Sequence, residues 1–254
     1  MTRGVLALAV ALTLLTGCAS SARKEEREKE SGYHYKMGMA HLEDQNLQGA
    51  LVEFRNARKI TPKDVKVLFA LGHTLFLIGE TEAARETMER LLKLKPRHGE
   101  AINYLGNIYE REGRTADAIA AFKRASELES YLTPHFALHN LGRLYLNQGD
   151  RALAETYFQA ALRRVPEYYP ARADLAKMYL DGEEWDRAVD EWRRFVDLVP
   201  QVKEGNYFLG RAYLGRGNRA FAREALNRFV TEVDPENPLV PEARALLDEL
   251  GVSP

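Results

Sequence analysis

Few residues in this sequence have types and spacings that could perform chemistry. His135 and His139 are four residues apart, so on a helix both imidazoles would share one face and could ligate a divalent metal. The glutamate of a metalloprotease pair is missing between them, and the sequence offers no evident third ligand. Adjacent carboxylates such as Glu183 and Glu184 are most simply interpreted as side chains on a solvent-exposed surface. With no glycine-rich phosphate loop and no recognisable nucleophile, the sequence predicts a protein that is not an enzyme and uses no cofactor, metal or small-molecule substrate.

The single cysteine lies where it could be acylated. Met1 to Gly17 contains one cation, Arg3, and an apolar run from Val5 to Leu15, a pattern typical of a secretory signal peptide. Leu15-Thr16-Gly17-Cys18 resembles the bacterial lipobox, in which the cysteine receives acyl chains such as palmitate and the signal peptide is cut before it. By this resemblance Cys18 is the lipidation site and tethers the chain to a membrane. The alternative is an ordinary signal peptide that happens to contain a cysteine.

Residues 18–30 are predicted to form a lipidated, charged tether behind the signal peptide of residues 1–17. Ala19 follows the cysteine in place of the aspartate that marks inner-membrane retention in enteric bacteria, so we expect an exported lipoprotein of the outer membrane that faces the periplasm. The run from Arg23 to Glu30 has four charges of each sign and therefore no net attraction to anionic lipid. It is either a spacer or a solvated helix supported by the pair Glu25 and Lys29.

An internal repeat organises the rest of the chain. Six alanines recur every 34 residues, with one step of 36: Ala50, Ala84, Ala118, Ala154, Ala188 and Ala222. Around them, the segment Leu141–Pro166 resembles a tetratricopeptide repeat, because Gly142, Tyr145, Phe158 and Pro166 fall at the signature positions. The sequence therefore predicts an all-α tetratricopeptide-repeat superhelix, an α-solenoid of six helix-turn-helix repeats and a C-terminal capping helix.

The predicted repeats can be placed by their small residues. They cover residues 31–64, 65–98, 99–134, 135–168, 169–202 and 203–236, followed by a capping helix and tail over 237–254. Small residues of each first helix should face bulky residues of the second, which are Phe54, Met88, Phe122, Phe158, Trp192 and Leu226. The tryptophan of the repeat pattern is absent from all six units and replaced by His34, Leu68, Ile102, Leu138, Arg172 and Asn206.

Repeats of this kind bind proteins through the concave side, which the first helices line. In the repeat frame, the first two repeats place apolar and aromatic residues there: Tyr35, Met39, Leu42, Phe69, His73 and Phe76. The third adds the polar residues Asn103 and Asn107, which could bond a peptide backbone. This partner-binding groove suits an amphipathic helix or an apolar-anchored extended segment. Some of these side chains could instead pack between helices or against the N-terminal segment.

Charge and motif order narrow the class of partner. The formal net charge is −1, with cations interleaved among acids, so we expect no nucleic-acid binding.

A lipobox, tether, six repeats and a long third repeat together resemble the lipoproteins of type IV pilus biogenesis, the pilotins of the pilus secretin. That resemblance implies a scaffold or chaperone that promotes outer-membrane targeting and multimerisation of secretin subunits. Two alternatives stay open: a scaffold for another envelope assembly, such as polysaccharide export or cell-wall synthesis, and an envelope enzyme with its activity hidden in the groove.

Overall fold

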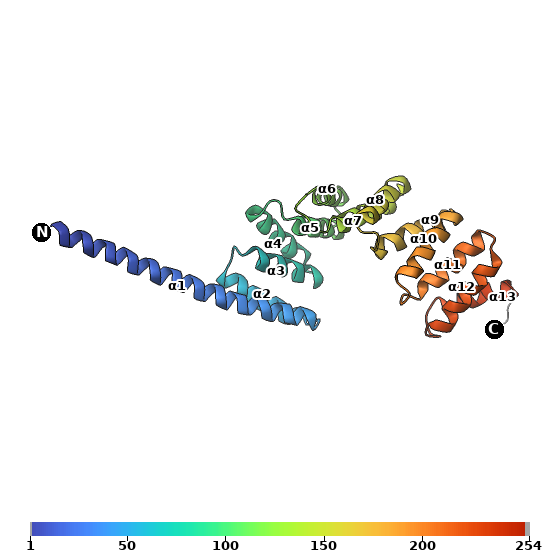
Figure 1. Ribbon diagram of the computed structural model, residues 1–254, viewed down its shortest axis with the longest axis horizontal. Helices are drawn as coiled ribbons and strands as arrows, with labels where there is room; N and C mark the ends of the chain where they lie inside the picture. The colour runs from blue at the N-terminus through green and yellow to red at the C-terminus, as the bar shows by residue number, and fades with distance from the viewer. Residues whose placement is uncertain (1, 252–254) are drawn as a thin grey trace. The chain divides into compact units, whose positions relative to one another are not determined.

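The protein is built from helices alone over residues 2–251, the part that the computed structural model describes, with side chains described from Ala22 onward (Figure 1). This confirms the predicted all-α class. The thirteen helices are α1 (Thr2–Glu43), α2 (Leu47–Ile60), α3 (Val65–Leu77), α4 (Thr81–Leu94), α5 (Gly99–Arg111), α6 (Thr115–Ser126), α7 (Pro134–Asn147), α8 (Arg151–Arg164), α9 (Tyr169–Asp181), α10 (Trp185–Leu198), α11 (Glu204–Gly215), α12 (Arg219–Glu232) and α13 (Val240–Glu249).

The helices belong to two compact units. The first comprises Met1–Arg124 and Leu128–Tyr131, and the second comprises Ala125–Glu127 and Leu132–Pro254. Within the first unit, each helix from α1 to α4 packs against the next one along the chain. Within the second unit, the same holds from α7 to α13. Sequential contacts of this kind are expected of stacked helix pairs, because each pair buries its apolar faces against its neighbours.

The turn inside each helix pair requires a left-handed backbone at one position. Four of these positions hold glycine, with φ between 73° and 88°: Gly79, Gly113, Gly149 and Gly217. The equivalent residues of the first and fifth pairs are Gln45 and Glu183, both with a φ of 57°. A residue with a Cβ is strained in this region, whereas glycine is not. Both side chains are exposed, so no buried side-chain contact compensates for the backbone strain.

Glu183→Gly is therefore expected to stabilise the protein. The change removes roughly 1–2 kcal/mol of left-handed strain, while glycine loses roughly 0.5–1 kcal/mol more entropy on folding. The free energy of unfolding in urea should rise by about 0.5–1 kcal/mol, as the difference between these terms. Gly149→Ala at the equivalent turn is the matched control and should lower it by a similar amount. A Glu183→Gly protein less stable than the wild type would contradict the explanation.

Close approach of paired helices defines the core of each unit. In the second unit, a Cβ built on Gly142 would lie 2.5 Å from Cδ1 of Phe158, closer than two carbon atoms can pack. The same relation holds between Gly38 and Phe54 and between Gly210 and Leu226. These bulky side chains are fully buried. The small-to-bulky contact therefore sets how near the two backbones of a pair come.

Helix α1 continues through the residues predicted to form the tether. Around residues 27–31, α1 is bonded to the C-terminal end of α2. Arg27 Nη2 donates to Ile60 O at 2.5 Å, and buried Ser31 contacts Thr61 Oγ1 at 2.5 Å. Residues 18–30 are thus helical and partly attached to the repeats. The individual repeat limits and the signal-peptide boundary stay predictions.

The lipidation prediction falls on a residue whose side chain lies outside the described ones. Cys18 belongs to α1 by its backbone. Among the helices searched over the described residues, none is both long enough and apolar enough to cross a bilayer.

Candidate partner-binding surface

An aromatic cluster of four residues lies on the first helices of neighbouring pairs in the first unit. Phe69, His73 and Phe76 occupy successive turns of α3, since they are four and three residues apart. Tyr104 comes from α5 and brings them together, with ring centroids 5.4 Å from Phe69, 4.9 Å from His73 and 6.3 Å from Phe76. All four side chains are half-buried, so each keeps part of its ring accessible. We call these four residues the aromatic cluster.

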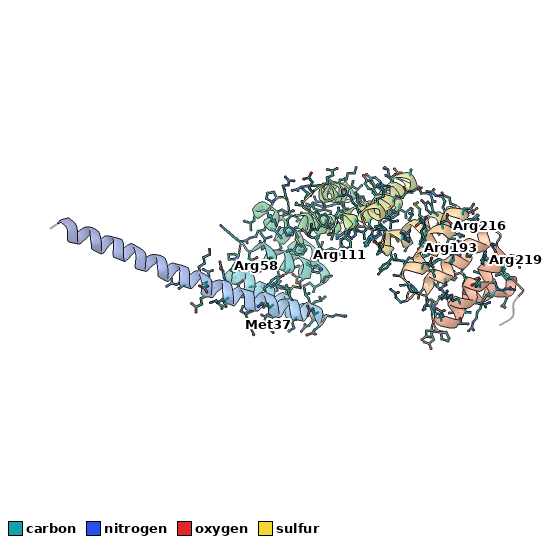
Figure 2. All side chains as sticks on the ribbon, in the orientation of Figure 1. Met37, Arg58, Arg111, Arg193, Arg216 and Arg219 are labelled. Carbon is teal, nitrogen blue, oxygen red and sulfur yellow. The ribbon has the colours of Figure 1, made fainter. Side chains whose placement is uncertain are left out.

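Arg111 and His98 border the aromatic cluster. The Arg111 guanidinium lies 3.6 Å from the centroid of the Phe76 ring, and its Nη1 donates to Phe76 O at 2.6 Å (Figure 2 marks this arginine). His98 stacks on Phe69 at 5.4 Å, and its Nδ1 accepts a hydrogen bond from Ala101 N at 3.2 Å. These contacts fix the Arg111 and His98 side chains at the edge of the aromatic cluster, so little side-chain entropy would be lost when a partner binds.

The electrostatics keep the aromatic cluster uncharged near neutral pH. Burial lowers the pKa of His73 below its ordinary value, because the protonated imidazole is poorly solvated there. Burial also raises the pKa of the Tyr104 phenol. For His98, burial is again the main cause that lowers the pKa, against an opposing effect of Glu100. The cluster therefore offers neutral rings with one fixed cation, Arg111, beside them.

The other predicted groove residues differ in how much of them a partner could reach. Tyr35, Met39 and Leu42 are half-buried on α1 and pack on one side against the core of the first unit. Asn103 is 6% exposed, and Asn107 is half-buried. Both asparagines already have interaction partners inside the protein, so they are less available to a peptide than their residue types imply.

Tyr104 and His98 were missed by the sequence reasoning. Neither belongs to the repeat positions that line the concave side, and the pattern therefore carried no signal for them. Tyr104 precedes the buried residue Leu105. The rotation of α5 about its own axis decides which neighbouring side chains the Tyr104 ring contacts. The structure adds both residues to the predicted set of Phe69, His73 and Phe76.

The histidine pair considered as a metal site has other partners. His139 Nε2 lies 2.8 Å from Asp174 Oδ2, and its Nδ1 lies 3.2 Å from Tyr168 Oη. His135 packs at 4.8 Å against the Tyr168 ring. No group of three His, Cys, Asp or Glu side chains is placed to hold a metal ion, as far as the described residues go. The pair functions here as part of the packing between α7 and α9.

Comparison with known proteins identifies the family. A family model of the tetratricopeptide repeat matches residues 69–130, 139–202 and 174–238, which together make up more than half of the chain. The chain belongs to the tetratricopeptide repeat family. The predicted repeat fold is thereby confirmed, and tetratricopeptide repeats form scaffolds for protein binding.

Two solved structures share this repeat fold over most of their length. PilF of Pseudomonas aeruginosa is 20% identical with a TM-score of 0.73, and the match covers 87% of this chain and 99% of PilF. PilW, described as a widely conserved type IV pilus biogenesis factor, is 22% identical with a TM-score of 0.73, over 84% of this chain and 97% of PilW. At these identities the similarity establishes the fold of the repeat protein.

Curated relatives match only through short stretches of repeats. The CTR9 homologue of Arabidopsis thaliana is 29% identical over 132 residues, which are 51% of this chain and 12% of the plant protein. Tetratricopeptide repeat protein 21B of Xenopus laevis is 24% identical over 58% of this chain and 11% of its own length. The repeat chain thus spans roughly a tenth of the length of these relatives.

Proposed function

We propose that this repeat protein is a lipid-anchored scaffold of the outer membrane that binds subunits of the type IV pilus secretin and promotes their targeting and multimerisation. The observation that carries the proposal is the aromatic cluster of Phe69, His73, Phe76 and Tyr104, whose half-buried, neutral rings are exposed on one side. The likeness to PilF and PilW over nearly the whole of each supports the choice of a pilus partner.

The aromatic cluster fits an apolar segment of an unassembled subunit. A secretin monomer that has not reached the membrane carries apolar surface that would otherwise meet water, and neutral aromatic rings bind such a surface without desolvating a charge. The fixed guanidinium of Arg111 can donate a hydrogen bond to a carbonyl or carboxylate oxygen of the same segment. Release follows when secretin subunits bury that surface against one another.

The lipid anchor would act by raising the local concentration of secretin subunits at the membrane. Cys18 with its acyl chains would confine the repeats to the membrane plane, so that captured subunits accumulate where they must insert. Because α1 is tied to α2 at Arg27, only the residues between Cys18 and Arg27 separate anchor and repeats. At the helical rise of about 1.5 Å per residue, this stretch spans roughly 14 Å. We therefore expect the repeats to lie close to the bilayer surface.

The decisive experiment measures SDS-resistant secretin multimers in outer membranes from cells with and without this gene. We expect the multimer to disappear while the monomer remains, and the wild-type gene to restore it. A gene carrying Cys18→Ala should yield a soluble repeat protein that restores little multimer, because its subunits are no longer gathered at the membrane. An unchanged multimer in the deletion strain would overturn the secretin proposal and direct the search to another envelope assembly.

A further inference from the structure

A positively charged surface lies in the first unit, where α1 meets the end of α2 and the start of α3. Three hollows adjoin one another there, since Glu28 and Thr61 line all of them. The cations that line these hollows are Arg23, Lys24, Arg27, Lys36, Lys63 and Lys66. All six side chains are exposed. We call these six residues the basic surface.

The acids of the same hollows do not neutralise the basic surface. Glu28 and Asp64 line the hollows with the six cations, so an excess of four positive charges remains. Asp64 Oδ1 is already used at the start of α3, where it accepts a hydrogen bond from Lys66 N at 2.8 Å. Among the residues whose side chains are described, none forms an ion pair with Lys63 or Lys66. These two ammonium groups are therefore available to a ligand from outside.

The positive excess arises only when the chain folds. The run from Arg23 to Glu30 is neutral, so taken alone it has no net attraction to anionic lipid. Glu26 and Glu30 of this run line none of the three hollows. Lys63 from the turn after α2 and Lys66 from α3 line the hollows instead. Folding thus adds cations of the second repeat to one side of the neutral run.

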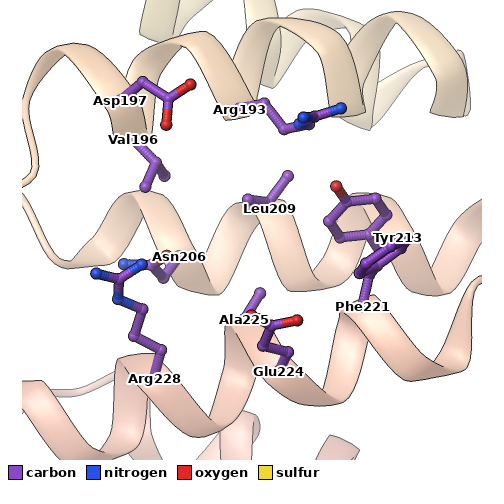
Figure 3. Close-up of a pocket in the computed structure, with 10 residues that line it drawn as sticks. All are labelled: Arg193, Val196, Asp197, Asn206, Leu209, Tyr213, Phe221, Glu224, Ala225 and Arg228. Atoms are coloured by element: carbon purple, nitrogen blue, oxygen red, sulfur yellow. The ribbon is translucent and has the colours of Figure 1, made fainter.

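The other repeats lack this pair of lysines. Lys63 and Lys66 follow Pro62 by one and four residues. After Pro96, Pro166 and Pro200, the same two positions hold Arg97 and Glu100, Glu167 and Pro170, and Gln201 and Glu204. Figure 3 shows a hollow of the second unit between α10 and α12, in which two cations and two acids balance: Arg193, Arg228, Asp197 and Glu224. The pair of lysines is thus placed at the repeats that follow α1 directly.

We propose that the basic surface binds the phosphate groups of anionic phospholipids and holds the first repeat against the membrane. This inference rests on the proposed function, because the acylated Cys18 places α1 at the bilayer. At the helical rise of about 1.5 Å per residue, Cys18 and Arg23 are roughly 8 Å apart along α1. That distance is about one Debye length in physiological salt, so the surface potential of anionic lipid still acts on these cations. Lysine and arginine side chains donate charge-assisted hydrogen bonds to phosphate oxygens.

The test measures co-sedimentation of the full chain carrying Cys18→Ala with lipid vesicles, so that acyl chains contribute nothing. We expect binding to vesicles of equal parts phosphatidylglycerol and phosphatidylcholine, little binding to phosphatidylcholine alone, and release by added sodium chloride. Changing Lys63 and Lys66 together to glutamate should lower the partition coefficient at least about tenfold. Changing both to arginine should preserve binding, because the positive charge is kept. Circular dichroism checks that each variant is helical.

A matched control separates the basic surface from the net charge of the chain. Arg163 and Arg164 are exposed cations at the end of α8 in the second unit, and changing both to glutamate alters the charge by the same amount. This variant should bind vesicles as the Cys18→Ala chain does. Equal binding to phosphatidylcholine alone, unchanged binding after reversal of Lys63 and Lys66, or an equal loss in the control would each overturn the proposal. Vesicle binding requires no secretin, so this test and the multimer assay can fail separately.

Discussion

Replacing Phe69 and Phe76 together with glutamate is expected to abolish secretin capture while leaving the helices folded. Aromatic anchors at the centre of an interface each contribute about 2 kcal/mol or more, so the affinity for a purified secretin subunit should fall at least about a hundredfold. Both side chains are half-buried, so a charge there can still reach water in the free protein. At position 76 the new carboxylate can also pair with Arg111, whose guanidinium now stacks on that ring.

The measurement is titration of the labelled subunit together with circular dichroism of each variant. Val52→Glu is the matched control, because Val52 is an apolar residue of the first unit that is 54% exposed on α2, a helix that contributes no residue to the aromatic cluster. It should bind as the wild type does. If the double variant retained wild-type affinity with normal helicity, the aromatic cluster would not be the capture site.

The largest loss of stability is expected from Phe158→Ala. Phe158 is fully buried in the second unit, where its ring fills the space against Gly142. Removing a buried phenylalanine side chain typically costs about 3–5 kcal/mol, because transfer free energy is lost and a cavity remains. Gly142 has no side chain that could move into that cavity. Urea unfolding should therefore show a drop of this size in the free energy of unfolding.

Phe221→Ala in the same unit is the matched control. Phe221 is 52% exposed on α12, so its truncation should cost less than about 1 kcal/mol. The contrast between the two phenylalanines tests burial, because the chemical change is identical. Equal losses in both variants would show that Phe158 does not carry the packing attributed to it.

The pattern of the sequence predicts those features that depend on local spacing. Recurring alanines at steps of 34 and 36 residues indicate helix pairs, and glycine marks four of the six turns that need a left-handed residue. Glycine in the first helix and a bulky residue sixteen positions later, as in Gly142 and Phe158, mark the contact of the pair. Each of these features is a short-range constraint, so it appears directly in the order of the residues.

The binding surface depends on tertiary contacts. The repeat frame places Phe69, His73 and Phe76 on one face of α3, but Tyr104 joins them only because α3 and α5 lie side by side. Successive helical residues differ by about 100° around the axis, so a small rotation decides whether a ring meets a neighbour or water.

The sequence by itself therefore determined the helix pairs, their turns, their internal contacts and the family to which they belong. The tertiary structure alone decided that α1 is tied to α2 through Arg27 and Ser31, and that Tyr104 completes the aromatic cluster. The physical reason is that these outcomes depend on distances between side chains of different helices, which packing sets and which spacing along the chain does not encode.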